Sequence, residues 1–114
     1  MQRSDWRLRI QDMLDAVVEI QAFTDGMDSI DFRSDARTVR AVEYDFVVLG
    51  EAARNVPEDV KTRYSGLPWP LMIGLRNVVA HQYRRVDPNV LWDTVTNDLS
   101  AVAPLLREIL EAEQ

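Results

Sequence analysis

The chain has 114 residues, 46% hydrophobic and 28% charged, which predicts one globular domain over residues 1–114 with a single core. It contains no cysteine and one histidine, which excludes disulfides and thiolate metal sites and argues against a transition-metal site. No apolar run approaches the roughly 20 residues that cross a bilayer. The charged N-terminus is unlike a secretion signal, so we expect a cytoplasmic protein with no membrane partner.

The net charge of −6 is the wrong sign for a protein that coats nucleic acid, but the charge is unevenly distributed. From Arg54 to Arg85 there are six basic and two acidic residues, so this segment carries +4 and the rest of the chain −10. Twelve of the 13 basic residues are arginine, which is better suited than lysine to bidentate phosphate contacts. Chance clustering and genome composition explain these two features equally well.

Apolar residues at helical spacing predict the first two helices. The first ends near Thr24 and is capped by Ser4, and a connector with one helical turn follows. The second spans residues 36–55 and is capped by Asp35 or Ser34. The stripes expected to face the core are Trp6, Ile10, Met13, Leu14, Val17 and Ile20 or Gln21 in the first helix, and Val39, Val42, Phe46, Leu49 and Ala53 in the second.

Prolines mark the boundaries of the remaining elements. Pro57 ends the second helix and is the first residue of a short helix, and the next helix runs from Pro70 to about His81. The last helix opens at Asp87 and Pro88 and continues to the C-terminus with a kink at Pro104. Its stripe is Trp92, Val95, Leu99, Val102, Leu106, Ile109 and Leu110. The predicted fold is all-α, an antiparallel four-helix bundle with an additional short helix.

The helix over residues 70–81 is apolar nearly all round, which predicts that it is covered on more than one side. At about 100° per residue, Leu71, Leu75 and Val78 share one face, which we expect to meet the core. The opposite face carries Ile73 and Ala80, and we expect it to pack against a second copy of the protein.

Polar residues border that second face, with Arg76 on one edge and Asn77 and His81 on the other. Arg76 and His81 are five residues apart, roughly 140° around the helix axis, so within one chain they diverge. Across a twofold axis through the apolar patch, the arginine of one copy approaches the histidine of the other.

Structural roles explain the same residues. A histidine near a helix C-terminus often serves as a favourable end charge, and an interior arginine often pairs with a carboxylate, here Glu43 or Glu51. For the other cations and the tryptophans, the corresponding roles are a solvated helix face (Arg54, Lys61 and Arg63) and core packing (Trp69 and Trp92).

Arginine together with histidine suits cleavage of a phosphodiester. A histidine can take the proton from a ribose 2′-hydroxyl or give one to the leaving 5′-oxygen, and a guanidinium can stabilise charge on the phosphorus oxygens. Neither role calls for a metal or another cofactor. The chain lacks a nucleophile elbow, a P-loop and a dinucleotide fingerprint. Because the attacking group is the 2′-hydroxyl, the sequence predicts an RNA substrate. Efficient cleavage uses both a base and an acid, and since one chain offers one histidine and a dimer offers two, the sequence also predicts a site shared by a homodimer.

The stretch "RNVVAHQY", from Arg76 to Tyr83, has the form R-x4-H-x-Y and resembles the motif of the HepT-like toxins of the HEPN superfamily. The upstream "GEAA" and Pro-Trp segments and the downstream "VLWDTV" also resemble that family, so the resemblance covers nearly the whole chain. One position departs from the pattern, because Gln82 stands where the family often has glycine. This larger side chain can alter how the helix ends and how tightly RNA fits.

The resemblance implies a dimeric, metal-independent endoribonuclease toxin with no cofactor. Its active site at the dimer interface would contain Arg76 and His81, lined by Asn77. It also implies an antitoxin partner, an MNT-type nucleotidyltransferase that transfers AMP to Tyr83 and can join the dimer in a larger hetero-oligomer. A bound adenylyl group would add bulk and negative charge beside the cleft and repel RNA.

Other residues of the basic segment complete the expected site. Arg84 and Arg85 at the rim of the cleft, together with Arg54, are the RNA-binding candidates. Glu51 in "GEAA" is either a buried partner of Arg76 or an ordinary surface residue. The rival interpretations are a non-catalytic HEPN interaction module, which binds the nucleotidyltransferase or RNA without cleaving it, and a plain helical scaffold.

Overall fold

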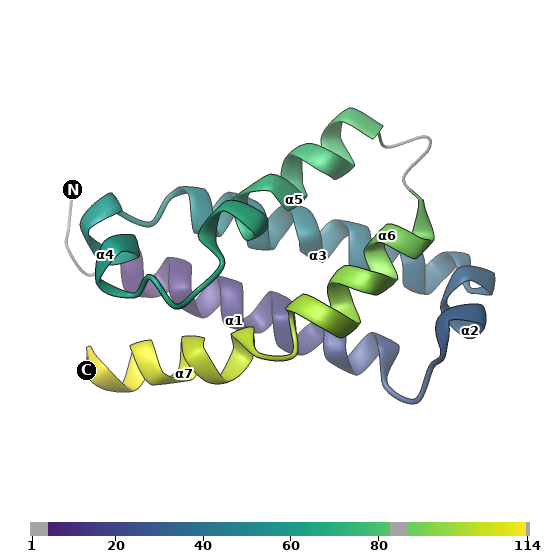
Figure 1. Ribbon diagram of the computed structural model, residues 1–114, viewed down its shortest axis with the longest axis horizontal. Helices are drawn as coiled ribbons and strands as arrows, with labels where there is room; N and C mark the ends of the chain where they lie inside the picture. The colour runs from purple at the N-terminus through teal and green to yellow at the C-terminus, as the bar shows by residue number, and fades with distance from the viewer. Residues whose placement is uncertain (1–4, 83–86, 114) are drawn as a thin grey trace.

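The computed structural model describes residues 5–82 and 87–113, and all the regular structure in these ranges is helical (Figure 1). The prediction of an all-α fold is confirmed. The elements are α1 (Asp5–Thr24), α2 (Ser29–Ser34), α3 (Ala36–Arg54), α4 (Glu58–Arg63), α5 (Trp69–Gln82), α6 (Pro88–Asp93), the π-helical segment η1 (Thr94–Asp98) and α7 (Val102–Ala112).

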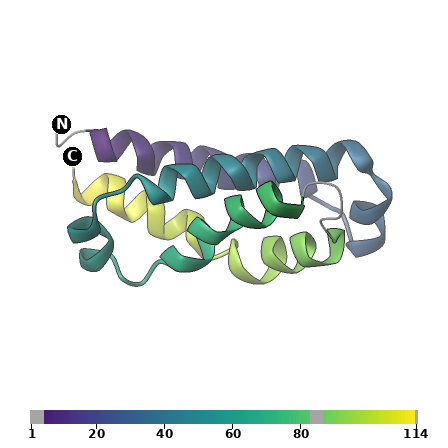
Figure 2. The same ribbon diagram turned by 90° about the horizontal axis from the view of Figure 1, so that it is seen from above.

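The two longest helices form the centre of the bundle. α1 and α3 lie side by side along the long axis, and α5 packs on α3 while α7 packs on α1 (Figure 2). α6 contacts α2 and α3 near the end of the bundle that holds α2. α4 and the end of α7 lie at the other end (Figure 1). The central position of α3 means that one face of it meets α1, another meets α5, and a third faces solvent.

The predicted apolar stripes form the core. In α1 the stripe is buried along its whole length, and Ile20 rather than Gln21 is its last fully buried member. In α3 every residue of the predicted stripe is buried except Val39, which is half-buried. Both tryptophans take the expected packing role, since Trp69 is buried and the half-buried Trp92 packs against Phe32 with 5.3 Å between ring centroids.

Aspartates cap the start of α2 and of α3. The connector after α1 contains a full six-residue helix, longer than the single turn expected, because Asp28 and Asp31 form a reciprocal capping box. Asp35, not Ser34, caps α3: its carboxylate accepts hydrogen bonds from the backbone N–H and the hydroxyl of Thr38. These bonds lower the pKa of Asp35 below its usual value.

Two proline predictions are wrong in detail. Pro57 is the residue before α4 rather than its first residue. Pro104 does not kink a continuous last helix, because the regular helix is interrupted by a turn at residues 99–101 and α7 begins at Val102. Pro104 is therefore in the first turn of a new helix, where a backbone N–H has no helical partner to lose. The π-helical segment η1 ends α6 at this break.

A carboxylate lies inside the interface between α1 and α3. Asp45 is 3% exposed, and its Oδ2 atom has no hydrogen-bond partner among the described residues. Burial makes the largest contribution, and the hydrogen-bonded carboxyl of Glu19 on α1 adds to it; together they raise the pKa of Asp45 from 3.8 to about 7. Two carboxyl groups can share a hydrogen bond only if one of them is protonated, so the folded chain favours a proton on Asp45.

Candidate active site

The motif helix α5 turns a different edge toward the core than its helical wheel suggests. Met72 is fully buried and Leu75 is 5% exposed, whereas Leu71 and Val78 are only half-buried. The predicted core face of Leu71, Leu75 and Val78 is therefore correct for Leu75 alone. The reason is that α5 packs mainly on α3, whose position the wheel of an apolar helix cannot reveal.

A glycine of α3 brings these two helices into close contact. A Cβ atom built on Gly50 would lie 2.7 Å from Cβ of Arg76, 2.9 Å from its backbone nitrogen and 3.0 Å from the carbonyl oxygen of Met72. The backbone of α3 therefore touches α5 at the arginine of the motif. A glycine inside a helix costs roughly 1 kcal/mol relative to alanine, which is the sequence signal that points to such a contact. The sequence interpretation did not use it.

Glu51 follows this glycine, and the structure decides its role, which the sequence leaves open. Its Oε1 lies 2.5 Å from Nε of Arg76, and the side chains of Glu51 and Arg76 are 42% and 38% exposed. Nη1 of Arg76 also donates a 3.2 Å hydrogen bond to the side-chain oxygen of Asn77. Glu51 is thus the ion-pair partner of Arg76 at a half-exposed position. The guanidinium is fixed at the surface by groups on two helices, with one edge toward solvent.

The structure places the remaining motif residues only in part. α5 continues unbroken to Gln82, so the backbone of His81 is helical and its position lies about 140° around the axis from Arg76. The side chain of His81 and the residues Tyr83, Arg84 and Arg85 lie outside the part of the chain that the structure describes.

The face of α5 that is expected to meet a second copy is partly exposed in the single chain. Asn77 and Ala80 are exposed, and Ile73 and Gly74 are half-buried. A Cβ atom on Gly74 would have no atom within 4 Å. Ile73 also packs against the hydrophobic core, so the described part of the chain covers this face only in part.

An apolar groove borders the same face. It runs between α5 and the segment formed by α6 and η1, with a volume of about 320 Å³. Val78 lines one wall and Thr94 another, Val90 at the rim is 51% exposed, and Gly74 belongs to both the groove and the open face of α5.

The other cations of the basic segment fall into two groups. Arg54, the last residue of α3, is exposed and lies one turn beyond Gly50. Lys61 pairs with Glu58 at 3.4 Å, and Arg63 pairs with Asp59 at 3.7 Å and with Glu113 at 2.9 Å, so both cations already have carboxylate partners. Of the three cations, Arg54 alone forms no ion pair with the described residues.

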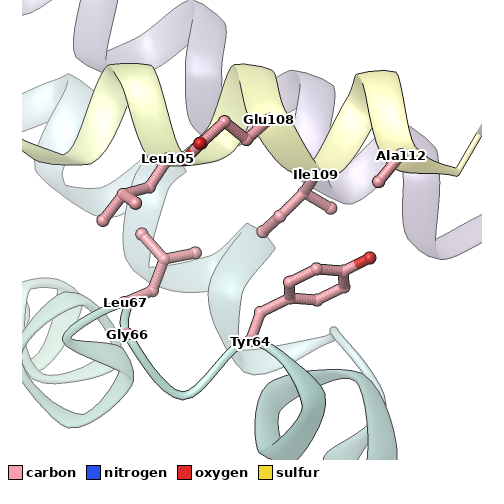
Figure 3. Close-up of a pocket in the computed structure, with 7 residues that line it drawn as sticks. All are labelled: Tyr64, Gly66, Leu67, Leu105, Glu108, Ile109 and Ala112. Carbon is pink, nitrogen blue, oxygen red and sulfur yellow. The ribbon is translucent and has the colours of Figure 1, made fainter.

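A second cavity lies at the other end of α5, away from the motif. It has a volume of about 280 Å³, and Figure 3 shows Tyr64 and Leu67 reaching from the segment after α4 toward Leu105 and Ile109 of α7. Next to it, the Tyr64 hydroxyl and Nη1 of Arg63 donate hydrogen bonds to Oε2 of Glu113, at 2.5 and 2.9 Å. These bonds hold the pKa of Glu113 below its usual value, the tyrosine bond contributing most. They fasten the end of α7 to α4.

Comparison with known proteins places this arrangement in a family. The family model described as "Ribonuclease HepT-like" matches residues 13–109. The chain is 32% identical to "Putative RNase MJ0127" of Methanocaldococcus jannaschii, over 96% of the chain and 93% of the relative. It is 34% identical to "Probable ribonuclease HepT" of Thermococcus cleftensis, over 82% of the chain and 84% of the relative. No solved structure gives a significant match.

The family match spans every element from the middle of α1 to the end of α7, including "GEAA" on α3 and the motif helix. The contact of Gly50 and Glu51 with Arg76 therefore lies within the region that the family shares. Separately, no helix in the described part of the chain is long and apolar enough to cross a membrane. The chain belongs to the HepT-like ribonucleases of the HEPN superfamily.

Proposed function

We propose that the chain is the toxin of a toxin–antitoxin pair and acts as a metal-independent endoribonuclease through Arg76 and His81. The observation that carries this proposal is the fixed guanidinium of Arg76, paired with Glu51 and held at the surface by the Gly50 contact. A cation held in place this way needs little reorganisation when charge develops on a phosphate. The names of the curated relatives as ribonucleases support the same chemistry.

The proposed reaction is transfer of a phosphodiester to the neighbouring 2′-oxygen. One histidine takes the 2′-hydroxyl proton, the 2′-oxygen attacks phosphorus, and the bond to the 5′-oxygen breaks. A second histidine gives a proton to the leaving 5′-oxygen, which leaves a 2′,3′-cyclic phosphate and a 5′-hydroxyl. Arg76 stabilises the negative charge on the phosphorus oxygens, and Asn77 keeps its guanidinium in place.

A shared site follows from the position of these residues on α5. The helix places Arg76 and His81 about 140° apart, so one chain cannot present both to one phosphate without a large bend. The open face of α5 lies between them, and two copies packed through Ile73 and Ala80 would bring the arginine of one toward the histidine of the other. The homodimer is therefore part of the proposal.

Regulation by an antitoxin completes the proposed function. An MNT-type nucleotidyltransferase would transfer AMP from ATP to the hydroxyl of Tyr83, with pyrophosphate as the leaving group. Tyr83 belongs to the same motif as Arg76, and an added phosphate there would bring negative charge to the site and repel RNA. Arg84 and Arg85, the next residues, would contact RNA at the rim of the cleft together with Arg54.

The catalytic part is tested by expressing the chain alone and by incubating the purified protein with RNA in the presence of EDTA. We expect growth arrest and RNA cleavage to 2′,3′-cyclic phosphate ends. His81→Ala and Arg76→Ala should each lower kcat by about 100-fold or more, since acid–base catalysis and charge stabilisation contribute such factors. Arg107→Ala, at an exposed position of α7, is the matched control and should stay active. If His81→Ala cleaves RNA like the parent, the catalytic proposal fails and the non-catalytic module is favoured.

The regulatory part predicts one modified residue. With ATP and the nucleotidyltransferase, the chain should gain the mass of one adenylyl group and lose its ribonuclease activity, and Tyr83→Phe should prevent both changes. Tyr44→Phe is the matched control, because Tyr44 is 67% exposed yet lies outside the motif. Intact-protein mass spectrometry reads the outcome. Modification of the Tyr83→Phe variant to the same extent would show that another residue is the acceptor.

A further inference from the structure

The outer face of α3 carries exposed arginines in a chain whose net charge is −6. All three arginines of this helix are exposed: Arg37, Arg40 and Arg54. Two of its three acidic residues, Glu43 and Asp45, are buried. The arginines of α3 therefore point outward while most of its carboxylates point inward.

The third acid of α3, Glu51, is already paired with Arg76. Glu43 is paired as well, with Arg40 at 3.4 Å, but the arginine side chain is 73% exposed and the glutamate only 12%. The exposed charge along α3 is thus mainly positive, with the carboxylate of Asp35 near Arg37 at its start and the half-exposed Glu51 near its end, although the whole chain carries −6. A polyanion is the partner whose charge complements this face.

An aromatic ring stands among these arginines. Tyr44 is 67% exposed, so its ring adds little to the core. Arg37, Tyr44 and Glu51 follow one another at intervals of seven residues, which on a straight helix drifts only about 20° per interval, and Arg40 lies one turn before Tyr44. The three side chains and Arg40 therefore form one stripe that ends at the Glu51–Arg76 pair.

The length of this stripe suits several nucleotides. At about 1.5 Å per residue, Tyr44 lies roughly 10 Å along α3 from Glu51, and Arg37 lies roughly 10 Å further. Proteins bind single-stranded nucleic acid by this combination, with cations on the backbone and exposed aromatic rings on which bases stack.

We propose that Arg37, Arg40 and Tyr44, named here the α3 track, bind the part of a single-stranded RNA next to the phosphate that lies at Arg76. The two arginines would contact phosphates and Tyr44 would stack on a base, so the track positions the substrate without touching the reacting atoms. This inference rests on the proposed ribonuclease function and extends the binding surface well beyond the R-x4-H-x-Y motif. Because stacking and phosphate contacts do not read base identity, the track would bind RNA with little sequence preference.

The test is binding of a fluorescein-labelled 2′-O-methyl RNA, which cannot be cleaved, measured by anisotropy over a range of salt concentrations. Arg37→Gln and Arg40→Gln should each weaken binding several-fold and reduce the slope of log K against log salt by about 0.7, the value for one phosphate contact on a single strand. Tyr44→Ala should weaken binding about 5-fold or more, whereas Tyr44→Phe, which keeps the ring, should bind like the parent. Arg107→Gln on α7 should change neither quantity.

Parallel measurements separate failure of the track from failure of the proposed function. If the parent cleaves ordinary RNA and the track variants bind the uncleavable RNA normally, the track is overturned while the ribonuclease stands. If the parent binds through the track without cleaving, the track stands and the catalytic proposal fails. Sedimentation of each variant tests the rival occupant, a second copy of the chain. Loss of the dimer in Arg37→Gln or Arg40→Gln with unchanged RNA binding per protomer would overturn the track.

Discussion

Gly50→Ala is expected to lower the free energy of unfolding by about 1 to 3 kcal/mol and to remove most of the ribonuclease activity. The added methyl group would lie 2.7 Å from Cβ of Arg76 and 3.0 Å from a backbone oxygen of α5, and neither can rotate away. α5 must therefore move off α3 and carry the guanidinium of Arg76 with it. A shift of about 1 Å at a catalytic group can cost on the order of 100-fold in rate.

The control for this substitution lies in the same helix pair. A Cβ atom on Gly74 would meet no atom within 4 Å, so Gly74→Ala should keep the stability of the parent or raise it by up to about 1 kcal/mol through helix propensity. Urea unfolding followed by circular dichroism, at one protein concentration, compares the two variants. Equal stability of Gly50→Ala and the parent would show that the close contact of α3 and α5 does not exist in solution.

Glu51→Gln separates the ion pair from the close contact. It keeps the size of the side chain but removes the charge beside Arg76, and a half-exposed pair of this kind contributes only about 0 to 1 kcal/mol to stability. The variant should therefore unfold like the parent yet cleave RNA with a lower kcat, because the guanidinium loses the group that orients it. A simple structural role for Glu51 would leave kcat unchanged.

Asp45→Asn is expected to stabilise the protein at pH 8 and to flatten the dependence of stability on pH. Burial between α1 and α3 raises the pKa of Asp45 from 3.8 to about 7, so the folded state binds a proton that the unfolded state releases. The difference corresponds to at most about 4 kcal/mol, since one pKa unit is worth about 1.4 kcal/mol. An asparagine keeps a donor for Glu19 at every pH and has no charge to bury.

The sign of this effect follows from proton linkage. Between the unfolded pKa of about 4 and the folded pKa of about 7, the folded chain holds more protons than the unfolded chain. The contribution of Asp45 to stability is therefore fully present below about pH 4, is lost as the pH rises to about 7, and changes little above that. The contribution of Asp45 should therefore make the urea midpoint of the parent higher at about pH 5.5 than at about pH 8.

Two further variants make the Asp45 prediction specific. Glu19→Gln removes the carboxylate that faces Asp45, so the fall in stability should move to lower pH. Asp93→Asn, at an exposed position of α6, should leave the pH dependence as it is in the parent. Destabilisation by Asp45→Asn at pH 8 would contradict the buried, proton-sharing arrangement.

In the proposed toxin, residues on different faces of α3 have different roles. Gly50 and Glu51 face α5 and position Arg76, whereas Asp45 faces α1. The α3 track, on the face between them, is free to bind RNA. Variants on the three faces should consequently change three different quantities, which are the rate of cleavage, the stability against pH and the affinity for RNA.

Local features of the sequence were enough to predict the all-α fold, most helix ends and most of the core. Helical periodicity and caps act over a few residues, so the sequence alone predicts the stripe of α1 up to a choice of Ile20 or Gln21 and the cap of α3 up to a choice of Asp35 or Ser34. The R-x4-H-x-Y motif and its flanks likewise predicted the family, which the comparisons confirm.

Contacts between residues far apart in the chain were decided only by the tertiary structure. The helical wheel of α5 could not show that Met72 rather than Leu71 faces the core, because an apolar helix has no polar face to orient it. The pairing of Glu51 with Arg76 and the burial of Asp45 beside Glu19 depend on how α3 packs between α5 and α1. Packing selects among several locally acceptable faces, and it therefore determined which side chains surround Arg76.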